Sequence, residues 1–359
     1  MHILITVFFN AHHGGLHDNI FSTIKQSIKL GNHITVVCKS GMFEERLKKI
    51  GVQVVTTDFH SNDNTTNDVI NAPKNDYDVI HAHPGPSREV ALQVSEKLEL
   101  PIVMTFHGMW ADSVVEYSDK LSAIFPVSEG VKDFLKRTLI DDFDKMMIMP
   151  NGVNKKLFKP KNKLFKRKDE VLNISLITRL DKDKDFIIQV FYKALEYTSN
   201  HFLTKVRWTI VGDGTELDSM KKTVKDITKG QQKVAFIGWK AGKELLKNYQ
   251  ESDIVIAPGR CALEAMACGK PVIAIGSKKY NGLVTKDNWT RGVYTNFGGF
   301  GNKMNDYIDG TIEAELEQVI SSQKLREELG SLGVFITDQF YNEDQINNKI
   351  IGVYNIIKN

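Results

Sequence analysis

One carboxylate, Glu264, stands in a short segment whose residues predict a helix between Gly259 and Gly269. Ala, Leu and Met favour helix, and glycine commonly ends one. The preceding apolar run stops at Ala257, so Glu264 is expected about one turn from a helix N-terminus, above the carboxyl end of a strand. A carboxylate only accepts hydrogen bonds, which suits it to the vicinal hydroxyls of a ribose. An ordinary exposed glutamate is the alternative.

Two cations, Arg179 and Lys184, follow the apolar run that begins at Leu172. The planar fork of Arg matches two phosphate oxygens, and Lys supplies a mobile point charge. Each contact near 4 Å contributes about 4 kcal/mol at an effective dielectric of about 20, so the pair could replace a metal ion as a diphosphate leaves. A solvated charged loop is the alternative, because three aspartates are interleaved with the cations.

In order and spacing, these segments resemble family 4 of the retaining nucleotide-sugar glycosyltransferases, and the likeness covers nearly the whole chain. It is carried further by Ile3–Val7 with His12-His13-Gly14-Gly15, Thr105-Phe106-His107-Gly108, Pro150-Asn151-Gly152-Val153-Asn154 with Phe158, Val211-Gly212-Asp213-Gly214 with Leu217, and Val234–Trp239. The resemblance implies a retaining hexosyltransferase that uses a nucleoside diphosphate sugar, with UDP-sugar favoured. The acceptor would be a sugar, a glycan or a lipid-linked molecule.

The fold implied by the resemblance is α/β of the GT-B type, with two Rossmann-like doubly wound lobes facing a central cleft. Residues 1–165 would form the acceptor-side domain and 166–341 the donor-binding domain. A terminal helix within 342–359 would cross back to the first lobe, and its Ile346, Ile350, Val353 and Ile357 share one helical face.

The resemblance also assigns roles residue by residue. The catalytic set is His107, Arg179, Lys184 and Glu264; the donor-binding set is Gly14, Gly15, Gly212, Ile237, Gly238, Trp239, Arg260, Leu263 and Glu264. The histidines of the first half lack the spacing of metal ligands, so no metal is expected. No cofactor is expected beyond the nucleotide sugar as co-substrate.

The chain departs from the family pattern at one position. Members commonly carry a further glutamate eight residues before the second, and Ile256 stands there. The loop between strand and helix is shortened to Pro258-Gly259-Arg260. Since a helix N-terminus favours anions, we hypothesise that Arg260 takes over part of the missing glutamate's work. Pairing of Arg260 with a nearby surface acid is the alternative.

Short apolar runs alternate with helical patterns, which predicts two parallel sheets. Further strands are expected at Ile34–Cys38, Val52–Thr56, Tyr77–Ala82, Pro101–Phe106, Ile124–Ser128, Ile148–Pro150, Trp208–Val211, Val234–Ile237, Ile254–Ala257, Val272–Ile275 and Val293–Asn296. Helices are expected at Asp18–Leu30, Ser87–Leu98, Glu129–Leu139, Cys261–Cys268 and Glu343–Ile357.

Residues 155–168 contain eight cations and no acid. Such a segment could attract anionic lipid headgroups at about 1 kcal/mol per cation, and taken alone it could equally bind nucleic acid. It could also be a solvated interdomain linker in which Phe158 packs. Nucleic acid is not expected as a partner, since the net charge of +3 gives no such indication.

Neither a membrane-spanning run nor a secretory leader is visible, and three cysteines without ligand spacing favour a reducing compartment. We therefore expect a cytoplasmic protein, with peripheral contact at the inner face of the membrane as a further expectation. Two rivals stay open: a nucleotide-sugar epimerase of the same fold and a non-catalytic sugar-nucleotide-binding protein. A nicotinamide-dependent oxidoreductase would need Gly-x-Gly-x-x-Gly after the first strand, which His13–His17 does not supply.

Overall fold

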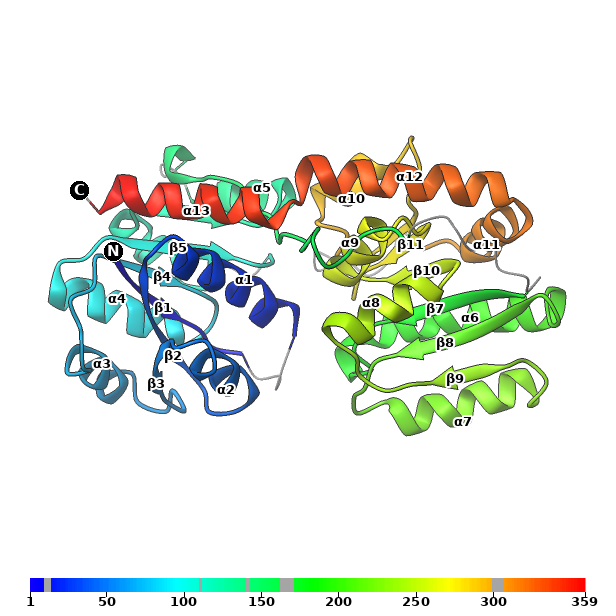
Figure 1. The fold of residues 1–359 in the computed structure, drawn as a ribbon, viewed down its shortest axis with the longest axis horizontal. Coiled ribbons are helices and arrows are strands. Elements are labelled where there is room, and N and C mark those ends of the chain that lie inside the picture. The colour runs from blue at the N-terminus through cyan, green and yellow to red at the C-terminus, as the bar shows by residue number, and fades with distance from the viewer. Residues whose placement is uncertain (10–13, 110–111, 140–142, 162–170, 299–306, 359) are drawn as a thin grey trace. The chain divides into compact units, whose positions relative to one another are not determined.

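The computed structural model describes residues 1–9, 14–109, 112–139, 143–161, 171–298 and 307–358. The chain forms two compact units, Met1–Gly152 with Glu343–Asn359, and Val153–Asn342 (Figure 1). The predicted boundary between residues 165 and 166 lies outside the described residues. Each unit has its own sheet and its own core.

The first unit is built on a six-stranded parallel sheet in the order β3-β2-β1-β4-β5-β6. Its strands are β1 (His2–Thr6), β2 (His33–Cys38), β3 (Gln53–Thr56), β4 (Val79–Ala82), β5 (Ile102–Phe106) and β6 (Ala123–Pro126). Its helices are α1 (Gly15–Lys29), α2 (Met42–Lys48), α3 (Asn62–Ile70), α4 (Ser87–Leu98), α5 (Glu129–Thr138) and α13 (Glu343–Ile357). The central strands are apolar on both faces because helices cover both.

Helix α13 packs beside α1 although more than 300 residues separate them (Figure 1). The hydroxyl of Thr23 on α1 donates to the side-chain oxygen of Asn347 on α13 at 2.8 Å. Ile346 and Ile350 of α13 are buried in the core of the first unit. The predicted return of the terminal helix to the first lobe is confirmed.

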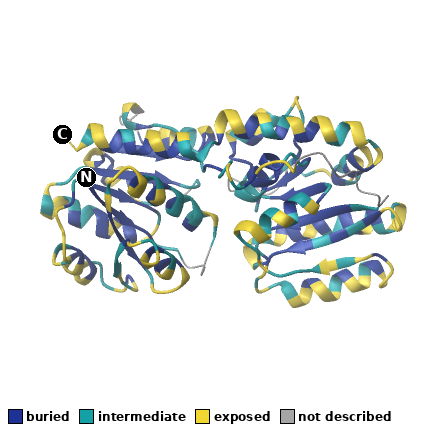
Figure 2. Cartoon of the chain, in the orientation of Figure 1, coloured by how far each residue is buried: buried dark blue, intermediate teal, exposed yellow. Residues whose placement is uncertain are grey.

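The second unit has a six-stranded sheet in the order β12-β11-β10-β7-β8-β9. Its strands are β7 (Leu172–Ile177), β8 (Val206–Val211), β9 (Val234–Phe236), β10 (Ile254–Ala257), β11 (Val272–Ile275) and β12 (Tyr280–Leu283). Its helices are α6 (Asp185–His201), α7 (Leu217–Thr228), α8 (Gly242–Glu251), α9 (Gly259–Ala267), α10 (Trp289–Tyr294), α11 (Thr311–Ser321) and α12 (Gln323–Phe340). Figure 2 shows the central strands buried, while the outer helices turn exposed faces to solvent.

Two predicted strands are wrong. Ile148–Pro150 runs beside β6, where Met149 N donates to Pro126 O at 3.0 Å, but Pro126 has no N–H to extend the ladder. The run Val293–Asn296 instead ends helix α10 and enters a turn. The antiparallel strand β12 was not predicted, since its four residues include Asn and Gly, which are uncommon in strands.

Candidate functional site

In the second unit, the loops that follow β7, β8 and β9 are locked together at the carboxyl end of the sheet. A Cβ on Gly212, whose φ is +151°, would lie 1.8 Å from the carbonyl oxygen of Thr178. The Gly212 N–H donates to the carbonyl of Gly238 at 3.0 Å, and Leu180 N donates to Asp213 O at 2.9 Å. Only glycine permits this approach, so Gly212 has a structural reason beside its predicted donor role.

Both predicted cations of the β7 loop are ion-paired. Arg179 contacts Asp181 and, at 3.0 Å, Asp183; the Lys184 ammonium lies 2.7 Å from the same Asp183 carboxylate. Burial acts to raise the pKa of Asp183, but Lys184 and Arg179 outweigh it and hold that pKa below its usual value. The two cations therefore share one carboxylate, and a bound diphosphate would compete with it for them.

Lys184 also links this loop to the turn between β11 and β12. Its ammonium donates to the hydroxyl of Ser277 at 2.6 Å. Because only β10 lies between β11 and β7 in the sheet, this hydrogen bond joins the loops on either side of β10. The carboxyl end of β10, which leads to Glu264, lies between them.

The Glu264 carboxylate is buried, with 4% of the residue exposed. Arg260 Nε donates to its Oε1 at 2.8 Å, and the Tyr249 hydroxyl donates to Oε2 at 3.1 Å. Both oxygens thus have a charged or polar donor, which offsets the cost of burying the carboxylate in an apolar helix.

The remaining predicted donor residues differ in exposure. Trp239 is 47% exposed after β9, beside half-buried Ile237 and Gly238. Leu263 is fully buried in the core that α9 shares with the sheet, so it supports the helix. Gly14 caps α1 in the first unit and Gly15 begins that helix, while His12 and His13 lie outside the described residues.

His107, directly after β5 in the first unit, belongs to a row of three histidines. Its Nε2 lies 3.1 Å from Nδ1 of His83, and the rings of His83 and His81 are 4.3 Å apart. The His81 ring also bonds the Thr105 hydroxyl at 2.6 Å and contacts the hydroxyl of Tyr354 on α13. His83 and His81 were not among the predicted site residues.

Burial, with a smaller contribution from the positive charge of Arg88, lowers the pKa of His107 to about 3. Burial likewise lowers the pKa of His81 to about 3 and that of His83 well below its usual value. The row is therefore neutral at physiological pH. It can exchange hydrogen bonds with hydroxyl groups but carries no charge.

Asn296 is a further residue near α9 that was not predicted. Asn296 and Phe297 both have positive φ, 54° and 50°, and the Gly259 N–H at the start of α9 donates to Phe297 O at 2.6 Å. Asn296 is 5% exposed, and its side-chain oxygen is without a hydrogen-bond partner among the described residues. Such backbone geometry away from glycine is uncommon and gathers at functional sites.

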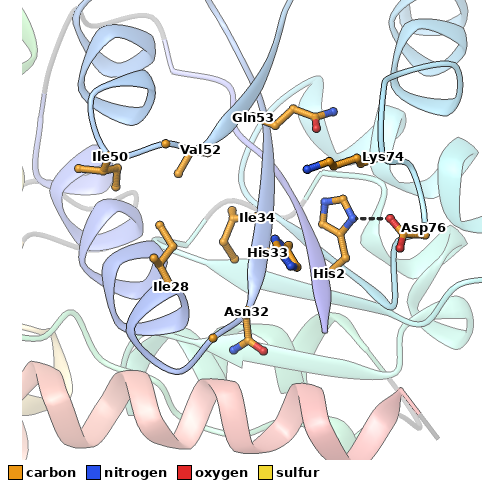
Figure 3. Close-up of a pocket in the computed structure, with 12 residues that line it drawn as sticks. His2, Ile28, Asn32, His33, Ile34, Ile50, Val52, Gln53, Lys74 and Asp76 are labelled. Carbon is orange, nitrogen blue, oxygen red and sulfur yellow. Dashed lines mark hydrogen bonds and ion pairs between the residues drawn. The ribbon is translucent and has the colours of Figure 1, made fainter.

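A cavity of about 610 Å³ opens at the amino ends of β1 and β2 in the first unit. Figure 3 shows His2, His33, Lys74 and Asp76 around it, with His2 Nδ1 and Asp76 Oδ1 3.1 Å apart. His107 follows the carboxyl end of β5, at the opposite edge of this parallel sheet. The cavity is therefore separate from the predicted site.

Among the described residues, three or more His, Cys, Asp or Glu side chains do not gather into a group that could hold a metal ion. Over the same residues, every helix is too short or too polar to cross a bilayer.

Two sheets of six strands, the second closed by an antiparallel edge, together with a terminal helix returned to the first unit, define a GT-B fold. Residues 154–331 match the family described as Glycosyl transferases group 1, and residues 13–157 match Glycosyltransferase Family 4. Together the two matches run from residue 13 to residue 331. The chain belongs to the family 4 type of GT-B glycosyltransferases.

Individual relatives match this chain at low sequence identity. An uncharacterised glycosyltransferase of Methanocaldococcus jannaschii is 26% identical over 229 residues, 55% of this chain and 57% of the relative. The alpha-monoglucosyldiacylglycerol synthase of Streptococcus pneumoniae is 24% identical over 58% of this chain and 54% of its own length. The match thus spans little more than half of these curated relatives.

Solved structures extend the likeness of fold to the whole chain. HepE of Anabaena, crystallised in complex with UDP-glucose, superposes with a TM-score of 0.72 at 18% identity, over 99% of this chain and 100% of that one. At this identity the likeness establishes the fold alone.

Proposed function

We propose that this glycosyltransferase moves a hexosyl-type group from a UDP-sugar to a sugar, glycan or lipid-linked acceptor, with retention of configuration and without a metal ion. The observation that carries the proposal is the set of groups around the strand ends of the second unit: Arg179, Lys184 and, on α9, Glu264. Family membership and the UDP-glucose complex of HepE support the nucleotide-sugar donor.

In this proposal the diphosphate binds Arg179 and Lys184 and displaces Asp183. Negative charge grows on the departing phosphate oxygen, so fixed cations there stabilise the transition state more than the ground state. They would do the work that a divalent cation does in metal-dependent transferases. Gly14 and Gly15, at the N-terminus of α1, would add backbone N–H donors for the phosphates.

Glu264 would accept hydrogen bonds from the ribose hydroxyls, while Trp239 and the adjoining Ile237 and Gly238 hold the base. His107 is assigned to a hydroxyl of the transferred sugar. In a front-face route the acceptor oxygen bonds to the anomeric carbon as the bond to phosphate breaks, and its proton passes to the leaving phosphate. That route retains configuration and needs no protein nucleophile.

A lipid-linked acceptor is supported by the name of the Streptococcus relative, which makes a glucosylated diacylglycerol. Contact between the basic segment 155–168 and anionic headgroups belongs to the same proposal. Of that segment, Lys155 pairs with Asp338 at 2.8 Å and Phe158 is buried, so the described part packs as a linker. Any headgroup contact would use Lys159 and Lys161 together with the cations from Lys163 to Lys168. Residues 163–168 lie outside the described part of the chain.

The test has two stages. A thermal-shift screen of UDP, GDP, ADP and their sugars identifies the donor. A ligand that binds only the folded protein raises the melting temperature of the protein. Turnover is then followed by mass spectrometry with and without acceptors, and product configuration by NMR. Consumption without an acceptor would indicate an epimerase, and binding without consumption a non-catalytic protein. Loss of activity in EDTA would contradict the metal-independent route.

A further inference from the structure

Arg88, the second residue of α4, is a buried cation outside the predicted site, with 4% of the residue exposed. Its Nη1 donates to Asp112 Oδ2 at 2.7 Å and its Nη2 to the carbonyl of Thr105 at 3.2 Å. The guanidinium also lies 4.0 Å from the centre of the Phe106 ring. Burying a guanidinium costs free energy unless hydrogen-bond and charge partners compensate it. Asp112, Thr105 and Phe106 supply that compensation for Arg88.

The partners of Arg88 lie on both sides of His107 in the sequence. Thr105 and Phe106 directly precede it at the end of β5, and Asp112 follows five residues later. The other oxygen of Asp112 accepts from the Tyr117 hydroxyl at 2.5 Å. One guanidinium thus ties together the two ends of the segment that carries His107.

Arg88 also sets the charge near the imidazole. Burial comes first and the Arg88 charge second in lowering the pKa of His107, and the same charge contributes to lowering that of His83. The titratable groups that face or adjoin the histidine row are His81 and His83 of the β4 end, Arg88 of α4, Asp112 and Tyr117 beyond β5, and Tyr354 of α13.

We propose that Arg88 is a positioning residue for the transfer reaction, holding the segment that carries His107 at both ends and placing a fixed positive charge behind the imidazole. This inference rests on the proposed role of His107 at the transferred sugar. The ring nitrogen Nε2 is held by His83, so Nδ1 is the nitrogen that meets the sugar hydroxyl. A protonated ring would have no lone pair to accept from that hydroxyl.

Three variants separate position from charge. Arg88→Met removes both, Arg88→Lys keeps the charge without the fork, and Asp112→Asn removes the partner carboxylate. We expect turnover to fall about tenfold or more in Arg88→Met, with donor KM nearly unchanged, because misplacing a reacting group costs rate rather than binding. In Arg88→Lys, turnover should fall as well, but the pH profile should match that of the parent enzyme.

The pH profile is the decisive readout. A cation next to His107 favours its neutral form, so loss of Arg88 should raise the pKa of His107 above about 3, while burial, the larger cause, still holds it below 6.5. The acid limb of turnover in Arg88→Met should move to higher pH accordingly. In Asp112→Asn, where the cation remains, the limb should not move up. NMR titration of the His107 ring reports the same shift without any turnover.

Folding is checked by circular dichroism and thermal unfolding. Should Arg88→Met fail to fold because the partly buried Asp112 is left with Tyr117 as its neutral partner, the double variant Arg88→Met/Asp112→Asn removes both charges. Normal turnover in either folded variant would overturn the inference. So would lost turnover with an unmoved His107 titration in Arg88→Met, since a purely structural role leaves the ring's charge unchanged.

His107→Gln distinguishes this inference from the proposed function. Full turnover in His107→Gln would remove the proposed role of His107, and the positioning role of Arg88 with it. Lost turnover in His107→Gln together with normal turnover in Arg88→Met would overturn the positioning role alone.

Discussion

Arg260 Nε donates to the Glu264 carboxylate at 2.8 Å, one turn further along α9. Of the two readings of Arg260 from the sequence, pairing with an acid is therefore realised, but the acid is the predicted ribose ligand and not a surface residue. Arg260 and Tyr249 together fix the orientation of the carboxylate, because each donates to a different one of its oxygens. Arg260 and Glu264 consequently act as one unit in any donor site on α9.

Replacing Glu264 with Ala should weaken binding of the donor about 10- to 100-fold, since hydrogen bonds to a charged group contribute about 1.5–3 kcal/mol. Isothermal titration with the nucleotide found in the thermal-shift screen measures the change. Glu244→Ala, at an exposed glutamate of α8, is the matched control and should bind normally. Unchanged affinity in Glu264→Ala would refute the ribose assignment.

Arg260→Ala should lower both donor affinity and turnover about tenfold, because a charge-assisted bond that orients Glu264 is lost together with a cation at the helix N-terminus. The exposed Lys243, in the first turn of α8, supplies the control Lys243→Ala. Steady-state kinetics at several donor concentrations separate the two effects. If both parameters stay at the parent value, Arg260 has not taken over work from the missing glutamate at Ile256.

Asp183→Asn should strengthen UDP binding a few-fold at neutral pH. In this variant the Asp183 carboxylate no longer competes with the diphosphate for Arg179 and Lys184. Asp226→Asn, on the exposed side of α7, controls for general charge. Weaker binding in Asp183→Asn would mean that the aspartate positions the cations.

The same pairing has a pH signature in stability. Folding lowers the pKa of Asp183 below its unfolded value of 3.8. Its contribution to stability is therefore fully present above pH 3.8 and is lost as the pH falls through the lower pKa of the folded state. The side chain is half exposed, which limits the contribution to about 1 kcal/mol or less. Urea unfolding of the parent and Asp183→Asn should therefore differ slightly at neutral pH and converge in acid.

Trp239→Ala should weaken donor binding by about 1–3 kcal/mol if the exposed indole stacks on the base. Stability should change by no more than about 0.5 kcal/mol, because the side chain is largely outside the core. Phe335→Ala, an exposed aromatic of α12, is the control. Equal affinity for the nucleotide in Trp239→Ala and the parent would place the base elsewhere.

Two glycine substitutions should act in opposite directions. Gly212→Ala would put a Cβ 1.8 Å from Thr178 O at a φ of +151°, so the protein should be strongly destabilised. Gly352→Ala lies in α13, where an added Cβ meets nothing within 4 Å, and should stabilise by about 0.5–1 kcal/mol. Denaturant unfolding measures both. A well-folded Gly212→Ala protein would contradict the close packing of the β7 and β8 loops.

The parallel sheets and the returning helix were predictable because apolar runs of strand length alternate with amphipathic helices and the motifs keep their order. Ile254–Ala257, Val272–Ile275 and Ser87–Leu98 were located to the residue. The strand expected at Val293–Asn296 failed because its β-branched and aromatic residues lie on a short helix and a turn, where tertiary contacts outweigh local preference.

The site was predictable only where a motif marked it. Arg88 and Asp112 are 24 residues apart, as are His83 and His107, and each pair meets because α4 returns the chain to the next strand of the sheet. No local spacing signals such a contact. The pairing of Glu264 with Arg260 was within reach of the sequence, since residues four apart share a helix face.

The division of the chain has a consequence for its synthesis. Val153–Asn342 is a continuous stretch, whereas the first unit is complete only with Glu343–Asn359. Until the ribosome has released Tyr354, the hydroxyl that contacts His81 is missing from the first unit, and so are Ile346 and Ile350 of its core. Although encoded later, the second unit is thus the first whose residues are all available to fold.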